Sequence, residues 1–168
     1  QVGMFIKIEE QKVKQADIEE KSLNSLVSYV DKTAEQMIVD ALSEMLPEAG
    51  FIAEEGTSAK KGKQYNWIID PLDGTTNFLH GLPIYSVSIA LQYHEEDEDE
   101  DEEEDEDVLR LRSGTKDEDG KPKPEIVLGV VYEVNRDECF YSWKGGRAYL
   151  NNDFIGVSPK TEVKNSLI

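Results

Sequence analysis

Cysteine and histidine are the scarcest polar residues of this 168-residue chain, with one cysteine and two histidines. A single thiol, Cys139, excludes a disulfide within the chain, and we expect a reducing, cytoplasmic location. Structural and catalytic zinc sites draw on several cysteine and histidine ligands, so zinc is disfavoured. Any metal centre must therefore use oxygen ligands.

Basic residues are also few, with 18 lysines and arginines against 36 aspartates and glutamates, giving a net charge of −18. Thirteen of the acidic residues form one run, residues 95–107, and without that run the net charge is −5. A nucleic-acid partner is not expected, because it requires a basic footprint. No apolar run approaches the roughly 20 residues of a membrane span, so we expect no membrane partner.

Apolar spacing predicts helices followed by strands. A helix is expected at residues 2–13, a loop at 14–25, and a second helix at 30–46, whose apolar residues recur at three- and four-residue steps. Alternating or apolar runs then predict strands at 51–55, 66–70, 85–93, 126–134 and 138–143. Two further short strands are expected on either side of a hairpin turn at Asn151-Asn152-Asp153. This order indicates one α+β domain over residues 1–168, with helices packed on an antiparallel sheet.

Residues 94–125 interrupt two strands that would otherwise form a hairpin. The segment contains the acidic run, and like charges at that density repel one another and cannot build a core. We expect a solvated, flexible hairpin insertion. The alternative is a docking segment for a basic partner or a loose cation-binding loop, which rests on the charge alone.

Carboxylates gather where two predicted strands end. Glu54 and Glu55 end one strand, Asp70 ends the next, and Asp73 follows after a proline. If these strands are neighbours, the carboxylates converge and repel one another, and Mg²⁺ relieves that repulsion with the oxygen ligands that it prefers.

Gly74-Thr75-Thr76 then begins a possible short helix, whose N–H groups can hold a phosphate. A metal clamp beside an anion site is what metal-assisted phosphate ester hydrolysis needs. The alternative is an ordinary Asp-Pro turn with capping threonines, and spacing alone leaves both open.

Three blocks resemble the inositol monophosphatase family of Mg²⁺-dependent, lithium-sensitive phosphatases. They are WIIDPLDGTTNFLHGLPIYSVSIAL at 67–91, VSYVDKTAEQMIVDALSEMLPEAGFIAEEG at 27–56 and GVVYEVNRDECFYSWKGGRAYLNN at 129–152. Apart from the 94–125 insertion, the resemblance covers nearly the whole chain. It implies the first layer of a layered αβαβα sugar-phosphatase fold whose C-terminal α/β half is absent here.

The resemblance also implies a Mg²⁺ site. Its ligands would be the carboxylates of Glu54 and Asp70 at the strand ends, the carbonyl of Leu72 and the turn residue Asp73. Asp70 would bridge ions, and Glu55 would support the ligands as a neighbouring carboxylate.

For the substrate, the resemblance implies that the N–H groups of Gly74 and Thr75 hold the phosphate, with Asp73 also close to the substrate. Asp31 and Thr75 would orient the attacking water, so that Asp31, Thr75, Glu54 and Asp70 form the implied catalytic set. Asp31 also fits an N-cap of the 31–46 helix. Lys21 is a candidate for a lysine in the family's mobile catalytic loop.

The implied protein is a homodimeric phosphomonoesterase acting on inositol monophosphate or a related small phosphorylated substrate. A later Trp-Asp motif of the family has no counterpart here, so we expect an N-terminal portion, truncated at both ends, that is inactive alone. Alternatives are a bisphosphate nucleotidase or fructose-1,6-bisphosphatase of the same superfamily, and a non-catalytic half-site module.

Overall fold

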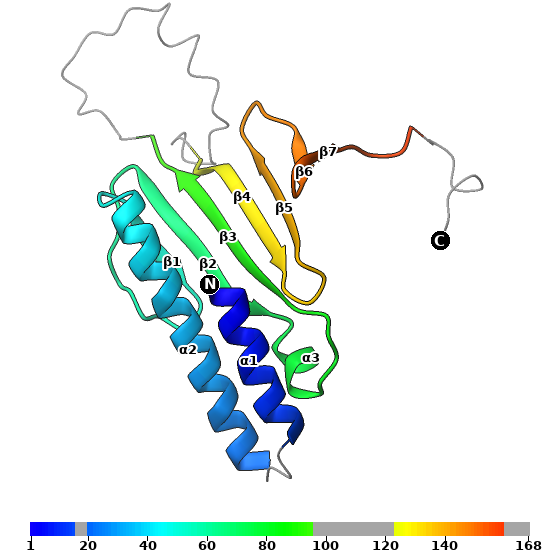
Figure 1. Ribbon diagram of the computed structural model, residues 1–168. Coiled ribbons are helices and arrows are strands. Elements are labelled where there is room, and N and C mark those ends of the chain that lie inside the picture. The colour runs from blue at the N-terminus through cyan, green and yellow to red at the C-terminus, as the bar shows by residue number, and fades with distance from the viewer. Residues whose placement is uncertain (16–19, 96–122, 160–168) are drawn as a thin grey trace, which may run out of the picture.

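The computed structural model describes residues 1–15, 20–95 and 123–159, with side chains described in these ranges outside residues 13–28. Two long helices, α1 (Val2–Gln15) and α2 (Glu20–Met45), lie side by side over one face of a sheet (Figure 1). The predicted helices at 2–13 and 30–46 are confirmed.

The predicted loop at 14–25 is wrong, because α1 continues to Gln15 and α2 already begins at Glu20. Leu23, Leu26 and Val27 extend the three- and four-residue spacing of the later stripe towards the N-terminus. The polar residues between them do not interrupt a helix, because only one stripe of a surface helix has to be apolar.

Seven strands form one sheet in which each strand pairs with the next in sequence. They are β1 (Gly50–Ala53), β2 (Tyr65–Asp73), β3 (Ser86–Tyr93), β4 (Glu125–Glu133), β5 (Glu138–Trp143), β6 (Ala148–Leu150) and β7 (Asp153–Ile155). The expected α+β arrangement is confirmed, with one refinement: β1 and β2 are parallel, whereas the pairs from β2 to β7 are antiparallel.

The core lies between the helices and the sheet. Ile6 of α1, Ile38 of α2 and Trp67, Ile69 and Val87 of the sheet are all less than 10% exposed and belong to one cluster. Alternation along β2 and β3 produces this pattern, because every second side chain points to the helices. The burial of apolar area at this layer is the main driving force of the fold.

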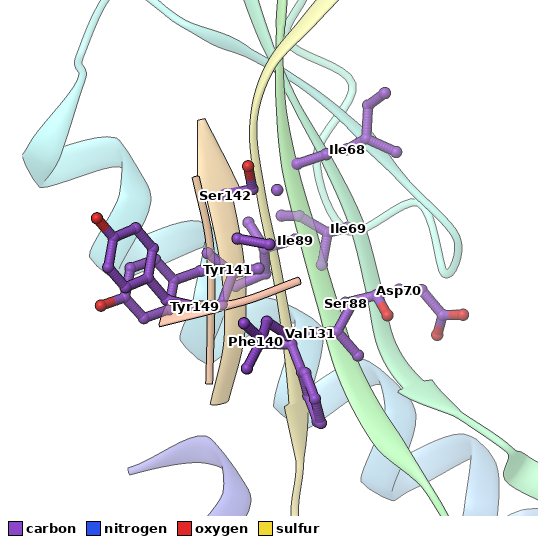
Figure 2. Close-up of a pocket in the computed structure, with 15 residues that line it drawn as sticks. Ile68, Ile69, Asp70, Ser88, Ile89, Val131, Phe140, Tyr141, Ser142 and Tyr149 are labelled. Atoms are coloured by element: carbon purple, nitrogen blue, oxygen red, sulfur yellow. The ribbon is translucent and has the colours of Figure 1, made fainter. Parts of the chain in front are cut away.

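The other face of the sheet carries Asp70, Ser88, Val131 and Phe140, which are successive cross-strand partners on β2 to β5. These four residues are among those that line a hollow of about 420 Å³ (Figure 2). Val131 is 41% exposed, so the helices α1 and α2 do not cover this face. Asp70 is the acidic residue of the otherwise apolar and hydroxyl-bearing lining.

β3 and β4 pair with Tyr93 opposite Glu125, so the stretch between them joins two neighbouring antiparallel strands. Of the acidic run 95–107, only Glu95 falls in the described ranges. The predicted flexible insertion at 94–125 therefore lies almost entirely outside the described residues and stays a prediction.

No helix in the described part of the chain combines the length and the apolar character needed to cross a membrane.

Phe78 should be a packing residue despite its place next to the acidic motif. Its side chain is fully buried and contacts the Tyr85 ring edge-on, with centroids 5.5 Å apart. Phe78→Ala should lower the free energy of unfolding by about 3 to 5 kcal/mol, because it leaves a cavity. Ile84→Ala, at a site that is 62% exposed, should change it by less than about 0.5 kcal/mol. Urea denaturation measures both, and equal losses would contradict the packing role.

Candidate functional site

The parallel pairing of β1 and β2 brings two acidic strand ends together. Ala53 pairs with Ile69, so the next residues along the two strands are Glu54 and Asp70. The Glu54 N–H donates to the Ile69 carbonyl over 3.3 Å, which extends the ladder past the end of β1. The two carboxylates are close enough that Glu54 contributes to raising the pKa of Asp70.

β2 changes its register against β3 between Asp70 and Asp73. Asp70 is opposite Ser88 and Asp73 is opposite Ser86, so β2 contains one extra residue here. Pro71 fits at such a bulge because it has no N–H to donate to the ladder. Pro71 and Leu72 are buried, whereas Asp70 is half-buried and Asp73 is exposed. The bulge therefore lets two aspartates reach solvent from a strand whose apolar residues stay in the core.

The predicted short helix is present as α3 (Thr75–Leu79), and Gly74 is its N-cap with φ of 95°. Only glycine adopts this left-handed conformation without strain. A Cβ at this position would lie 3.0 Å from the Ile84 carbonyl oxygen and 3.2 Å from the Tyr85 Cβ. No side chain caps the helix.

Thr75 does not act as the capping threonine of an ordinary turn. Its hydroxyl donates to the Leu72 carbonyl over 2.9 Å. The Leu72 N–H in turn donates to Asp70 Oδ1 over 3.2 Å. This chain of contacts holds the Asp70 carboxylate, the Leu72 carbonyl and the Thr75 hydroxyl in one turn.

Asp31, which is on α2, interacts with the carboxylates at the strand ends. Its pKa is raised from 3.8 to about 7, first by burial and then by the negative charges of Glu55, Glu54, Asp70 and Glu35, in that order. The N-cap interpretation of Asp31 is wrong, because α2 begins at Glu20 and Asp31 lies inside the helix. Lys21 lies in the same helix and not in a loop.

The pKa of Asp70 is also raised, from 3.8 to about 6, first by burial and then by repulsion from Glu54 and Asp73. The bond from the Leu72 N–H lowers it in part. Within the described ranges, no three acidic, histidine or cysteine side chains form a ready-made metal-ligand group. The observed donors are nonetheless all oxygens that repel one another, and such a set suits a hard divalent cation.

Glu35 is the residue at this site that the sequence did not reveal. It is fully buried, its Oε2 accepts from the Glu55 N–H over 2.7 Å, and its Oε1 accepts from the Thr57 N–H over 2.8 Å. One signal was available. Glu35 is four residues from Asp31, on the helix stripe that also carries Ile38 and Leu42, where a carboxylate needs a buried partner.

A model of the inositol monophosphatase family matches residues 1–98 of the chain. Over 164 residues the chain is 32% identical to a protein of Aquifex aeolicus named fructose-1,6-bisphosphatase/inositol-1-monophosphatase, covering 98% of this chain and 51% of the relative. Over 149 residues it is 35% identical to a putative Nus factor SuhB of Neisseria meningitidis, covering 88% of this chain and 46% of the relative.

Solved structures share the fold. An IMPase of Thermotoga maritima superposes with a TM-score of 0.61 and 30% identity, covering 94% of this chain and 50% of that structure. The extragenic suppressor protein SuhB of Bartonella henselae gives a TM-score of 0.63 and 29% identity, covering 95% of this chain and 50% of that structure. The chain thus spans about half the length of the curated relatives and structures that it matches.

The raised pKa of Asp31 predicts that metal-free protein loses stability as pH rises. The folded state binds this proton more tightly than the unfolded state, so the contribution is complete below about pH 4 and is lost as pH rises through about 7. Asp70 acts in the same direction, with its loss centred near pH 6. Asp31→Asn should therefore make the decline between pH 5 and 8 shallower and should stabilise the protein at pH 8.

Urea denaturation in the presence of a chelator, at each pH unit from 5 to 8, measures this slope. Asp40→Asn is the matched control, because Asp40 is an exposed carboxylate on the same helix. It should keep the wild-type slope. Parallel curves for wild type and Asp31→Asn would contradict the assignment.

Proposed function

The chain belongs to the inositol monophosphatase family, and we propose that it supplies the metal- and phosphate-binding half of a Mg²⁺-dependent phosphomonoesterase. The proposed substrate is inositol monophosphate or a related small sugar phosphate, hydrolysed by water. The observation that carries the proposal is the pairing of β1 with β2, which sets Glu54 beside Asp70 and next to the Gly74 turn. The family resemblance further supports a cytoplasmic homodimer as the proposed assembly.

The residues that would hold Mg²⁺ are Glu54, Asp70, the Leu72 carbonyl and Asp73. The fit rests on their chemistry, because all four donate oxygen and the carboxylates repel one another without a cation. A carbonyl oxygen has two lone pairs, so the bond from Thr75 leaves one at Leu72 for a cation. Bound Mg²⁺ would supply polarisation of the phosphoryl oxygens and acidification of a water.

Asp31 and Thr75 are proposed to orient that water. The Thr75 hydroxyl donates its proton to the Leu72 carbonyl. Towards water, the Thr75 oxygen can therefore act only as a hydrogen-bond acceptor. Asp31 is buried beside the strand-end carboxylates, and a pKa of about 7 suits a group that accepts a proton near neutral pH. The two residues come from different elements, α2 and α3.

The start of α3 is the proposed phosphate-binding site. Gly74 is an N-cap with no side chain of its own and no side-chain cap bond. The N–H groups of Gly74 and Thr75 can therefore approach an anion closely, and the first N–H groups of a helix have no partner inside the helix. Asp73 precedes Gly74 and is exposed, so it is the proposed partner of a substrate hydroxyl.

One relative favours a second candidate within the superfamily. The Aquifex aeolicus protein carries both fructose-1,6-bisphosphatase and inositol-1-monophosphatase in its name, so a sugar bisphosphate is the alternative substrate class. A screen of phosphate release from inositol phosphates, sugar bisphosphates and adenosine bisphosphates, with and without lithium, discriminates between the branches. A non-catalytic half-site module would bind Mg²⁺ without releasing phosphate from any of them.

Asp73→Asn should reduce Mg²⁺-dependent phosphate release by the protein that carries this chain by about 100-fold, because it removes the negative charge of a ligand of the proposed site. The fold should be unchanged, since Asp73 is exposed. Phosphate release and circular dichroism measure the two effects. Asp153→Asn, at another exposed strand residue, is the control and should keep wild-type activity. A fully active Asp73→Asn protein would refute the metal role.

A further inference from the structure

We propose that Glu35 is a positioning residue, which holds the segment 54–57 so that the Glu54 carboxylate stays directed at Asp70. The inference rests on the proposed function, because positioning matters only if Glu54 and Asp70 serve a common ligand. Glu35 itself does not touch the proposed metal ligands through any of its described hydrogen bonds. It contacts the backbone next to them.

Each backbone N–H from residue 54 to residue 57 has a partner. The Glu54 N–H donates to the Ile69 carbonyl over 3.3 Å, and the Gly56 N–H donates to the Ala53 carbonyl over 3.3 Å. The N–H groups of Glu55 and Thr57 both donate to the Glu35 carboxylate. Two of the four anchors of this segment are thus the two oxygens of one side chain.

The segment wraps around the Glu35 carboxylate as an anion-binding concavity. Gly56 has a φ of 70°, which turns the backbone so that the N–H groups on either side of it point to the same place. The bonds of 2.7 and 2.8 Å are in the range of charge-assisted hydrogen bonds. A neutral amide cannot reproduce this arrangement, because glutamine has only one acceptor oxygen.

Burial makes the anchor rigid. Glu35 has no exposed surface, and the buried Ala34 and Ile38 lie on either side of it along α2. A buried charge is tolerated only where hydrogen bonds compensate it, so the carboxylate is held to its two donors. Glu54, in contrast, is exposed, so its own surroundings restrain its side chain less than those of Glu35 restrain Glu35. The position of the Glu54 side chain therefore depends on the Glu35 anchor.

The test is Mg²⁺ affinity by titration calorimetry on the protein that carries this chain, with unfolding by urea recorded for every variant. Glu35→Ala should weaken Mg²⁺ binding by about 10- to 100-fold, as loss of a residue that orients a metal ligand does. Glu35→Gln, which keeps the shape and one acceptor, should fall between wild type and Glu35→Ala. The control is Leu42→Ala, a core truncation on the same helix, which should lower stability but leave the affinity unchanged.

Amide proton chemical shifts, measured by NMR, add evidence that does not depend on the global stability of the variants. In Glu35→Gln, the amide proton of Glu55 or Thr57 should shift upfield, because one of them loses its charged acceptor. The Phe78 amide, which donates to the Gly74 carbonyl, should not move. If Glu35→Ala does not fold, the affinity and amide shifts of Glu35→Gln decide the matter.

The possible outcomes distinguish a failure of this inference from a failure of the proposed function on which it rests. Wild-type protein that binds no Mg²⁺ would overturn the proposed function, and the inference with it. Wild-type protein that binds Mg²⁺, together with unchanged affinity in both Glu35 variants, would overturn the inference alone. The same holds if Leu42→Ala loses as much affinity as Glu35→Ala, because the effect would then follow global stability.

Discussion

Repulsion among carboxylates at one edge of the sheet is the constraint on which the rest of this molecule depends. It arises because β1 and β2 run parallel, so that the two strand ends carrying Glu54 and Asp70 meet. An antiparallel pair would have placed the ends of these strands at opposite edges. The pKa values of Asp31 and Asp70 are raised first by burial and then by these neighbouring carboxylates. Concentrated negative charge of this kind is what the proposed divalent cation would neutralise.

The remaining structure keeps these groups in place despite their repulsion. The helices bury one face of the sheet, and the same helix α2 that supplies core residues such as Ile38 also supplies Asp31 and Glu35. Apolar burial stabilises the fold as a whole, whereas hydrogen bonds determine where each carboxylate points. The two long-range bonds of Glu35 are the clearest example, because they join α2 to the loop after β1.

The motif at residues 70–78 divides its residues between packing and chemistry. Pro71, Leu72 and Phe78 are buried and anchor the turn in the core, and Gly74 permits its backbone geometry. Asp70, Asp73 and Thr75 are left at the open side of the same turn. The bulge in β2 makes this division possible, because it changes which side chains face inwards between Asp70 and Asp73. The family match over residues 1–98 includes the whole motif.

Local patterns in the sequence determined the strands from β1 to β7, the helices at 2–13 and 30–46, the turn at Gly74 and the acidic character of the site. These features depend on neighbours within a few residues, so spacing and turn chemistry reveal them. Only the tertiary structure decided that β1 pairs in parallel with β2, that α2 begins at Glu20 and that Asp31 is buried inside it. It alone showed that Glu35 is bonded to residues about twenty positions away. Pairing direction, burial and long-range hydrogen bonds depend on which segments meet in space, and no local window of sequence contains that information.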